Sequence, residues 1–522
     1  MRESQKIWIA ECEWKSTERT ADMRRKKSFI LILSAILFSF WFTGFDLSEL
    51  VKRGGQFFVI IKKMFPPDIS YVPKIISPLL DTVKMSFAGT FIGSAAALLA
   101  SPFCASGLIA NKYVYSILKA TINILRAIPV LIIALALSFI FGTGSFSGAF
   151  AIALYTFGII CRLTWKDIEQ TPKNTMEALC AAGIGKTKVY ITTVFVDIFP
   201  NFLSNCLYVL ESNVRHAAIL GYVGAGGLGI ILSEKISWND YAKVGMILIM
   251  LFAVVFIIET LSSYLRRLLN GELNPQVKGA VLWITIIFAV FCILSIDPPK
   301  ITSAGIKIFK GIFYGITHPD MGLIFTLSTK GVPYLLLETL CIAAAGTFIG
   351  AVVSVVTAFL GSRNINGKVC SGVMKVIILA VRTMPAVIYG LIFIRVAGPG
   401  AFAGVLTLGM LSTGMCTKLY INTLDSMNKS TMEGIRAMGV TKFAALRHAV
   451  WPEVKNRFFA SAMYRFDVNL REASVLGLVG AGGIGTQLIF SMSGYLWSYA
   501  GAYILGLIVL ILIVDKLNSS IV

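Results

Sequence analysis

Long uncharged stretches constrain this chain more than any other feature of its sequence. Segments without Asp, Glu, Lys or Arg include residues 28–45, 85–103, 127–161, 244–258, 279–296, 340–362, 396–417 and 473–514. A helix needs about 20 mostly apolar residues to cross a bilayer. Residues 127–161 and 473–514 are too long for one crossing, and glycine-rich interruptions predict that each folds back. We therefore predict an all-α integral membrane protein with 10 to 12 crossings.

Composition and charge agree with a membrane protein. Hydrophobic residues make up 56% of the chain and charged residues only 14%, which excludes a soluble globular protein. The net charge of +20 would suggest nucleic acid in a soluble chain, but in a membrane protein it indicates basic cytoplasmic loops. Basic clusters at residues 24–27, 112, 162–166 and 266–267 place both termini in the cytoplasm. We predict no nucleic-acid partner and a lipid bilayer around the chain.

The sequence offers no metal, cofactor or nucleotide site. Nine cysteines are scattered without a CxxC pair, so neither a metal nor a disulfide is implied. Residues 224–229 match GxGxxG, but they lie among transmembrane segments and lack the acidic partner of a dinucleotide site. Close helix packing or a helix break at membrane depth explains these glycines better. The glycines concerned are Gly224, Gly226, Gly227, Gly229, Gly480, Gly482, Gly483 and Gly485.

The two halves of the chain repeat each other. A spacing of 256 residues relates Arg126 to Arg382, Pro129 to Pro385, Gly142 to Gly398, Gly183 to Gly439 and Arg215 to Arg471. We expect a cytoplasmic segment at 1–27, a first half at 28–268, a linker at 269–280 and a second half at 281–522. Each half would have about six crossings, with five as the alternative. An even number gives parallel halves related by a pseudo-twofold axis along the membrane normal.

A polar segment between the fourth and fifth crossings is also repeated. Each copy places a glycine six residues after a glutamate, which predicts a short helix, a sharp turn and a second helix on the cytoplasmic side. This pattern resembles the Glu-Ala-Ala…Gly loop of permeases from ATP-binding cassette (ABC) importers. The residues that carry the match are Glu177, Ala178, Gly183, Glu433, Gly434 and Gly439, of which Gly434 replaces the first alanine.

The resemblance implies several partners and a location. In this family the loop is the coupling helix that docks on a cytosolic ATPase, so two ATPase copies would bind the two loops. An extracytoplasmic binding protein would deliver the substrate, and the permease itself would not be an enzyme. The location implied is the bacterial cytoplasmic membrane. Arg-x-x-Pro at 126–129 and 382–385, together with residues 213–229 and their repeat, is similar to the phosphonate-type permeases, which implies phosphonates or related phosphorus oxyanions as substrate.

Intramembrane charges suggest where an anion would pass. Arg215 and Arg471 each follow an acid four residues earlier, Glu211 and Asp467, on one helical face. These arginines are either neutralised by that acid or line a shared path, where guanidinium groups match oxyanions in bidentate geometry. The further candidates for the path are Asn213, Asn469, Arg126 and Arg382, the last two with a structural alternative.

Two other functions remain open from the sequence. The same importer role would serve another small solute, such as an amino acid, a quaternary amine or a vitamin precursor. An ion-driven secondary transporter with parallel repeats is a different class. It would place carboxylates at the membrane midplane in both halves, and only Glu211 with Asp467 qualifies by position.

Overall fold

The computed structural model describes residues 30, 32–106, 111–171, 178–268, 275–299, 302–427, 439 and 441–521. Within these ranges every regular element is helical and no strand occurs. In the described part of the chain, eight helices are long and apolar enough to cross a membrane, and up to 11 spans result if each of three bent helix pairs counts as one. The predicted all-α class is confirmed. The upper count of 11 lies within the predicted range of 10 to 12, and the lower count of eight lies below it.

The helices of each half follow the same order. The first half contains α2 (Leu47–Arg53), α3 (Gly55–Lys63), α4 (Val72–Cys104), α5 (Lys112–Ala127), α6 (Val130–Phe141), α7 (Ser145–Gln170), α9 (Lys186–Val189), α10 (Phe195–Leu220), α11 (Leu228–Ser237) and α12 (Tyr241–Arg267). The second half contains α13 (Pro275–Leu294), α14 (Ser303–Thr317), α15 (Met321–Phe325), α16 (Val332–Gly361), α17 (Arg363–Thr383), α18 (Ala386–Ala397), α19 (Ala401–Asp425), α21 (Lys442–Ala445), α22 (Trp451–Leu476), α23 (Ile484–Ser493) and α24 (Trp497–Ile521).

Two spans differ from the uncharged segments of the sequence. The predicted crossing that begins at Ala127 is broken, because α5 and α6 bend by 85° beside Pro129. Proline lacks the N–H that continues a helix, so the chain turns there. In the second half, α17 qualifies as a span although four basic residues kept it out of the uncharged segments. Arg126 and Arg382 therefore lie at the ends of α5 and α17, next to the proline break, and not inside an unbroken apolar helix.

Glycines allow the closest helix contact within each half. α4 packs along α7, and α16 packs along α19. A Cβ atom added at Gly89 would lie 2.6 Å from the backbone oxygen of Ala149, and one added at Gly346 would lie 2.6 Å from the Cβ of Leu408. Only glycine fits at these positions of the repeated Gly-x-x-x-Gly motif, as in other closely packed membrane helices.

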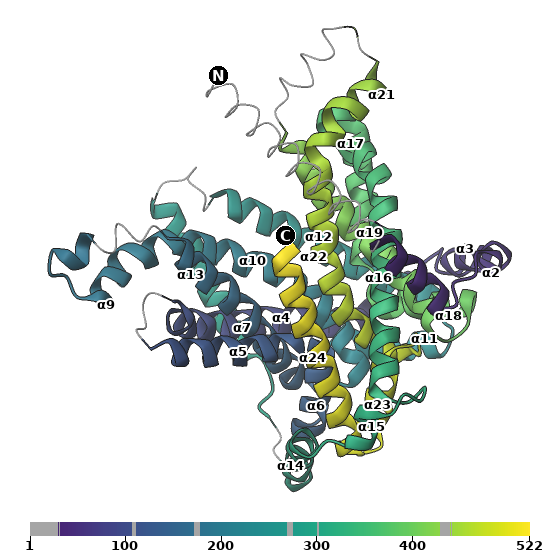
Figure 1. The fold of residues 1–522 in the computed structure, drawn as a ribbon, viewed down its shortest axis with the longest axis horizontal. Coiled ribbons are helices and arrows are strands. Elements are labelled where there is room, and N and C mark those ends of the chain that lie inside the picture. The colour runs from purple at the N-terminus through teal and green to yellow at the C-terminus, as the bar shows by residue number, and fades with distance from the viewer. Residues whose placement is uncertain are drawn as a thin grey trace, which may run out of the picture.

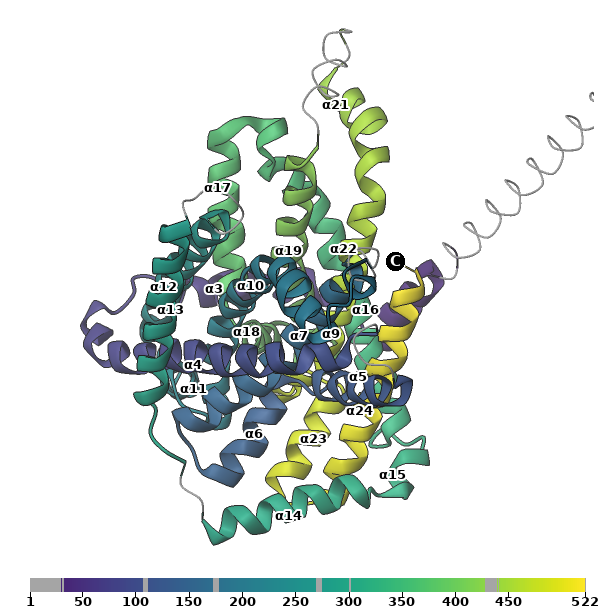
Figure 2. The same cartoon turned by 90° about the vertical axis from the view of Figure 1, so that its left-hand side faces the viewer.

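The two halves cross steeply and share one apolar core. In Figures 1 and 2 the long helices α16, α22 and α24 stand upright while α4 and α7 run across the view. Buried side chains from α6 and α7 join those from α16, α18 and α19 in one cluster. In Figure 1, α9 projects at one end of the first half, and α2 and α3 lie at its opposite end. In the second half, α21 projects at one end and α14 lies at the other.

Candidate functional site

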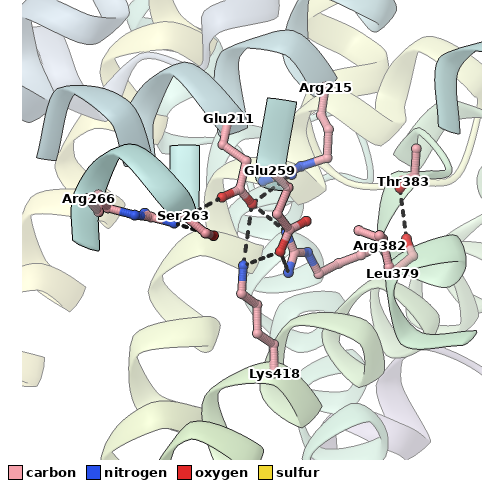
Figure 3. Close-up of polar contacts among 9 residues, drawn as sticks. All are labelled: Glu211, Arg215, Glu259, Ser263, Arg266, Leu379, Arg382, Thr383 and Lys418. Atoms are coloured by element: carbon pink, nitrogen blue, oxygen red, sulfur yellow. Dashed lines mark hydrogen bonds and ion pairs between the residues drawn. The ribbon is translucent and has the colours of Figure 1, made fainter. Parts of the chain in front are cut away.

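Six charged side chains meet where the first half contacts the second. Glu211 and Arg215 lie on α10, Glu259 and Arg266 on α12, Arg382 on α17 and Lys418 on α19 (Figure 3). We call this group the first inter-half cluster. Its helices come from both halves, so the cluster joins the repeats to each other.

Glu211 is the centre of the first cluster. Its side chain is 1% exposed, and its Oε1 atom lies 2.5 Å from Arg382 Nη2 and 3.2 Å from Arg215 Nη1. Lys418 Nζ lies 3.4 Å from the same oxygen and 2.8 Å from Glu259 Oε1. Arg382 also contacts Glu259, with 3.2 Å between Nη2 and Oε2. Buried charges are stable only when they are paired in this way.

A second inter-half cluster repeats the arrangement with the halves exchanged. It contains Arg126 on α5, Arg162 on α7, Asp467 and Arg471 on α22, and Asp515 on α24. Arg126 pairs with Asp515, and Arg162 Nη1 lies 3.2 Å from Asp515 Oδ2. Arg471 Nη2 lies 2.5 Å from Asp467 Oδ2. Here the cations of the first half reach the carboxylate of the second.

The two clusters are related by the sequence repeat. Glu259 and Asp515 are 256 residues apart, as are Arg162 and Lys418. Two-fold symmetry produces such reciprocal contacts, because residue i of one copy then meets residue j of the other and the reverse. None of these four residues was predicted as part of the site from the sequence. Their shared spacing was the signal that would have found them.

Glu211 and Asp467 were predicted as the carboxylates at the membrane midplane, and two further acids also lie in apolar spans. Glu259 and Asp515 lie within the apolar spans Tyr241–Arg267 and Trp497–Asn518. All four carboxylates are paired with arginine or lysine. A repeated acid in a span is thus no sign of ion-driven transport in this chain.

Arg215 and Arg471 have the geometry that their spacing predicts. Each contacts the acid four residues earlier on its own helix, and their side chains are 14% and 15% exposed. The Nη1 atom of Arg471 is buried and has no hydrogen-bond partner. Arg471 therefore keeps one donor available for a ligand after its own carboxylate is bound.

Asn213 and Asn469 fasten helices within their own halves. Both side chains are buried. The Nδ2 atom of Asn213 donates to the hydroxyls of Thr90 and Thr156, each at 2.8 Å. Asn469 donates likewise to Thr347 at 2.7 Å and to Ser412 at 2.6 Å. Each asparagine therefore joins three helices of its own half, and its assignment to the substrate path stays a prediction.

The glycine-rich segment ends α10 and α22 in both halves. Gly224, Gly226 and Gly227 have φ between +73° and +82°, and Gly480, Gly482 and Gly483 have φ between +75° and +80°. Gly229 and Gly485 lie in the short helices that follow, α11 and α23. The N–H of Leu228 donates to Thr82 Oγ1 at 2.8 Å, and that of Ile484 donates to Thr339 Oγ1 at 2.9 Å. Each break is therefore anchored to the first long helix of its half.

The repeated loops that were predicted on the cytoplasmic side turn at their predicted glycines. Gly183 has φ +84° and Gly439 has φ +76°, a left-handed conformation that ends a helix. The N–H of Ala182 donates to the carbonyl of Ala178 at 3.0 Å within the preceding turn. Glu177, Glu433 and Gly434 lie outside the described residues. Five-residue π-helical turns, Tyr190–Val194 and Leu446–Val450, follow the two loops.

The clusters are not identical in the two halves. Arg465 Nη2 lies 2.6 Å from Glu472 Oε2, and this pair exists only in the second half. Val209 and His216 occupy the corresponding positions of the first half. The His216 ring contacts Tyr155 instead, with 5.3 Å between ring centroids.

In the part of the chain that the structure describes, no group of three or more His, Cys, Asp or Glu side chains is arranged to hold a metal ion.

Comparison with known proteins identifies the repeat. A family model described as "Binding-protein-dependent transport system inner membrane component" matches residues 97–274 and again residues 350–521. The Phosphate-import permease protein PhnE of Mycolicibacterium smegmatis is 26% identical over 499 residues, which cover 93% of this chain and 92% of that protein. The Phosphite transport system permease protein PtxC of Stutzerimonas stutzeri is 38% identical over 185 residues, 35% of this chain and 67% of that protein. A putative cryptic phosphonate transport permease protein, PhnE2 of Escherichia coli, is 33% identical over 115 residues, 22% of this chain and 94% of its own length.

Proposed function

The chain belongs to the family of binding-protein-dependent transport system inner membrane components, and we propose from this premise that it forms the pathway for a phosphorus oxyanion through an ABC importer. It is a multi-pass membrane protein and a transport component, not an enzyme. The family model matches it twice, so the predicted tandem duplication and the predicted resemblance are confirmed. One chain then supplies both permease halves.

The charge between the halves is the observation that carries the proposal. The two inter-half clusters together contain seven cationic and four carboxylate side chains, each within 4.0 Å of a partner of opposite sign. A net positive interface attracts anions and rejects cations. The names of the relatives, which mention phosphate, phosphite and phosphonate, supply the class of anion. Quaternary amines are disfavoured as cargo by the same charge.

The partners follow from the family and the two repeated loops. The family description calls the transport system binding-protein-dependent, which supports a binding protein that delivers the substrate on the outer side. We propose that two ATPase copies bind the cytoplasmic turns at Gly183 and Gly439, with both termini of the permease in the cytoplasm. The matching left-handed glycines support equivalent docking sites.

An uptake assay tests the cargo and the role of Arg471. Cells that depend on this transporter are given labelled phosphate, phosphite, methylphosphonate or a neutral amino acid. We expect uptake of at least one phosphorus oxyanion and none of the amino acid. Arg471→Lys should lower oxyanion uptake about tenfold, because lysine keeps the charge and loses the guanidinium geometry. Uptake of the amino acid alone would overturn the proposal.

A pull-down tests the coupling turns separately. Gly183→Val and Gly439→Val put a β-branched side chain at positive φ, where it is strained. We expect each single variant to retain part of the co-purifying ATPase and the double variant to lose it. Gly372→Val, on a partly exposed position of α17 with open space for a Cβ, is the control for folding. Equal ATPase recovery from all variants would contradict docking at these turns.

A further inference from the structure

A cavity of about 660 Å³ lies beside the first inter-half cluster. It is lined by residues of α12 from the first half and by residues of α17 and α19 from the second half. Glu259, Arg382 and Lys418 belong to its wall and also to the cluster. The remaining lining extends to Arg267 at the end of α12 and to Asp425 at the end of α19, which precedes the second cytoplasmic loop. The cavity therefore reaches from the cluster to the predicted cytoplasmic side.

The mouth of this cavity carries more positive charge than its neighbours neutralise. Arg267, Arg363 and Lys375 line it, with Asp425 as the carboxylate among them. Asp425 is already bound by Lys375 Nζ at 3.0 Å and by the backbone N–H of Arg363 at 2.9 Å. Within the described ranges, no ion pair joins the side chain of Arg267 or Arg363 to a carboxylate. Two guanidinium groups therefore remain available for an anionic ligand.

The outer wall of the cavity is apolar and continues onto the surface that faces lipid. Phe256 and Val376 line the cavity and are 45% and 51% exposed. Beside them, Ile257 on α12 and Ile377 on α17 are 61% and 51% exposed. These side chains lie on membrane spans, so their exposed surface meets acyl chains. A ligand with a charged head and an apolar body matches both walls.

We propose that this cavity binds an anionic phospholipid of the cytoplasmic leaflet, with its phosphate between Arg267 and Arg363 and its acyl chain against Phe256 and Val376. Basic pockets between transmembrane helices on the cytoplasmic side recognise such headgroups. The bound lipid bridges α12 of the first half and α17 of the second. It thus joins the halves at one side of the molecule, next to the buried ion pairs.

The other half lacks the same set of charges. Lys119 and Glu169 reproduce the pair of Lys375 with Asp425, with 2.7 Å between Nζ and Oε1. The sequence, however, has Gly107 at the position that corresponds to Arg363. We therefore expect one lipid site in the chain and not two.

The test measures lipid binding to the purified full chain in a neutral detergent by native mass spectrometry. Phosphatidylglycerol and phosphatidylcholine are titrated separately. The variant is Arg267→Gln with Arg363→Gln. Lys112→Gln with Lys166→Gln, two exposed basic residues of the first half outside the cavity, is the matched control for lost charge. Thermal unfolding without added lipid shows that each protein is folded.

We expect one phosphatidylglycerol to bind the wild type in preference to phosphatidylcholine. The Arg267 and Arg363 variant should bind it about 25-fold more weakly, because each cation near a lipid headgroup contributes about a fivefold gain in affinity. The lysine control should match the wild type. Equal phosphatidylglycerol affinity in all three proteins would overturn the proposal. So would displacement of the lipid by millimolar inorganic phosphate, which would instead assign the cavity to a soluble oxyanion.

Discussion

The cations that cross between the halves have different numbers of carboxylate partners in the two clusters. Arg382 and Lys418 each contact both Glu211 and Glu259. Arg126 and Arg162 share Asp515, and within the described residues no other carboxylate lies within ion-pair distance of them. A buried charge that loses its partner is far more costly than one that keeps a second. Glu259 and Asp515 occupy equivalent positions in the repeat, but loss of Asp515 should destabilise the protein more than loss of Glu259.

We expect Asp515→Asn to destabilise the protein by about 3–5 kcal/mol, because it leaves Arg126 and Arg162 unpaired. Glu259→Gln should lower the free energy of unfolding clearly less, since Glu211 still binds Arg382 and Lys418. Unfolding of both purified variants by a denaturing detergent measures the difference. Equal losses, or a larger loss for Glu259→Gln, would show that Glu211 does not compensate.

At the scale of elements, proline and glycine decide where the long helices stop. Pro129 and Pro385 start new helices after Arg126 and Arg382. Left-handed glycines end the short 3-10 turns Gly221–Val223 and Gly477–Val479. The two copies of this glycine turn differ in their surroundings. A Cβ at Gly224 would lie 2.8 Å from Thr143 Cγ2, whereas nothing lies within 4 Å of one at Gly480.

Alanine at these two glycines should therefore have unequal effects. Gly480→Ala should destabilise the protein by about 1–2 kcal/mol, because alanine is strained in the left-handed conformation of this residue. Gly224→Ala adds a contact with Thr143 that requires the threonine to move, so its midpoint of thermal unfolding should be lower. Gly372→Ala, in a helix with free space, should be neutral or stabilising by about 0.5–1 kcal/mol. A destabilised Gly372→Ala would mean that side-chain bulk in general, and not left-handed strain, causes the losses.

For the whole molecule, the reciprocal ion pairs and the shared apolar core hold the halves together without the covalent link. Contacts between Arg126 and Asp515, and between Arg382 and Glu259, cross from one half to the other in both directions. Seven residues, 268–274, connect α12 to α13, and the predicted linker of 269–280 overlaps this connection and the start of α13. A fused chain of this kind should then behave as a dimer of its two halves.

We expect a protease site inserted at residues 269–274 to be cleaved without separation of the halves. The two fragments should elute together in gel filtration in detergent, because their interface is intact. Combining the site with Asp515→Asn should make the fragments separate more readily. Separation of the otherwise unchanged protein after cleavage would contradict a stable interface between the halves.

The sequence by itself determined the class of protein, the duplication and the local pairs of charges. Whether a segment inserts into the membrane depends on its own uncharged residues, which the sequence shows directly. A repeat is likewise visible when the two halves of the sequence are compared. The pairs of Glu211 with Arg215 and of Asp467 with Arg471 follow from the helical spacing of four residues, so they were predictable too.

Only the tertiary structure decided which charges meet across the halves. Arg126 and Asp515 are 389 residues apart, and no local pattern joins them. The contacts of Asn213 and the cavity beside Lys418 likewise depend on how separate helices pack. The physical reason is that helix formation and membrane insertion depend on neighbouring residues, whereas the partner of a buried charge is chosen by the packing of both halves.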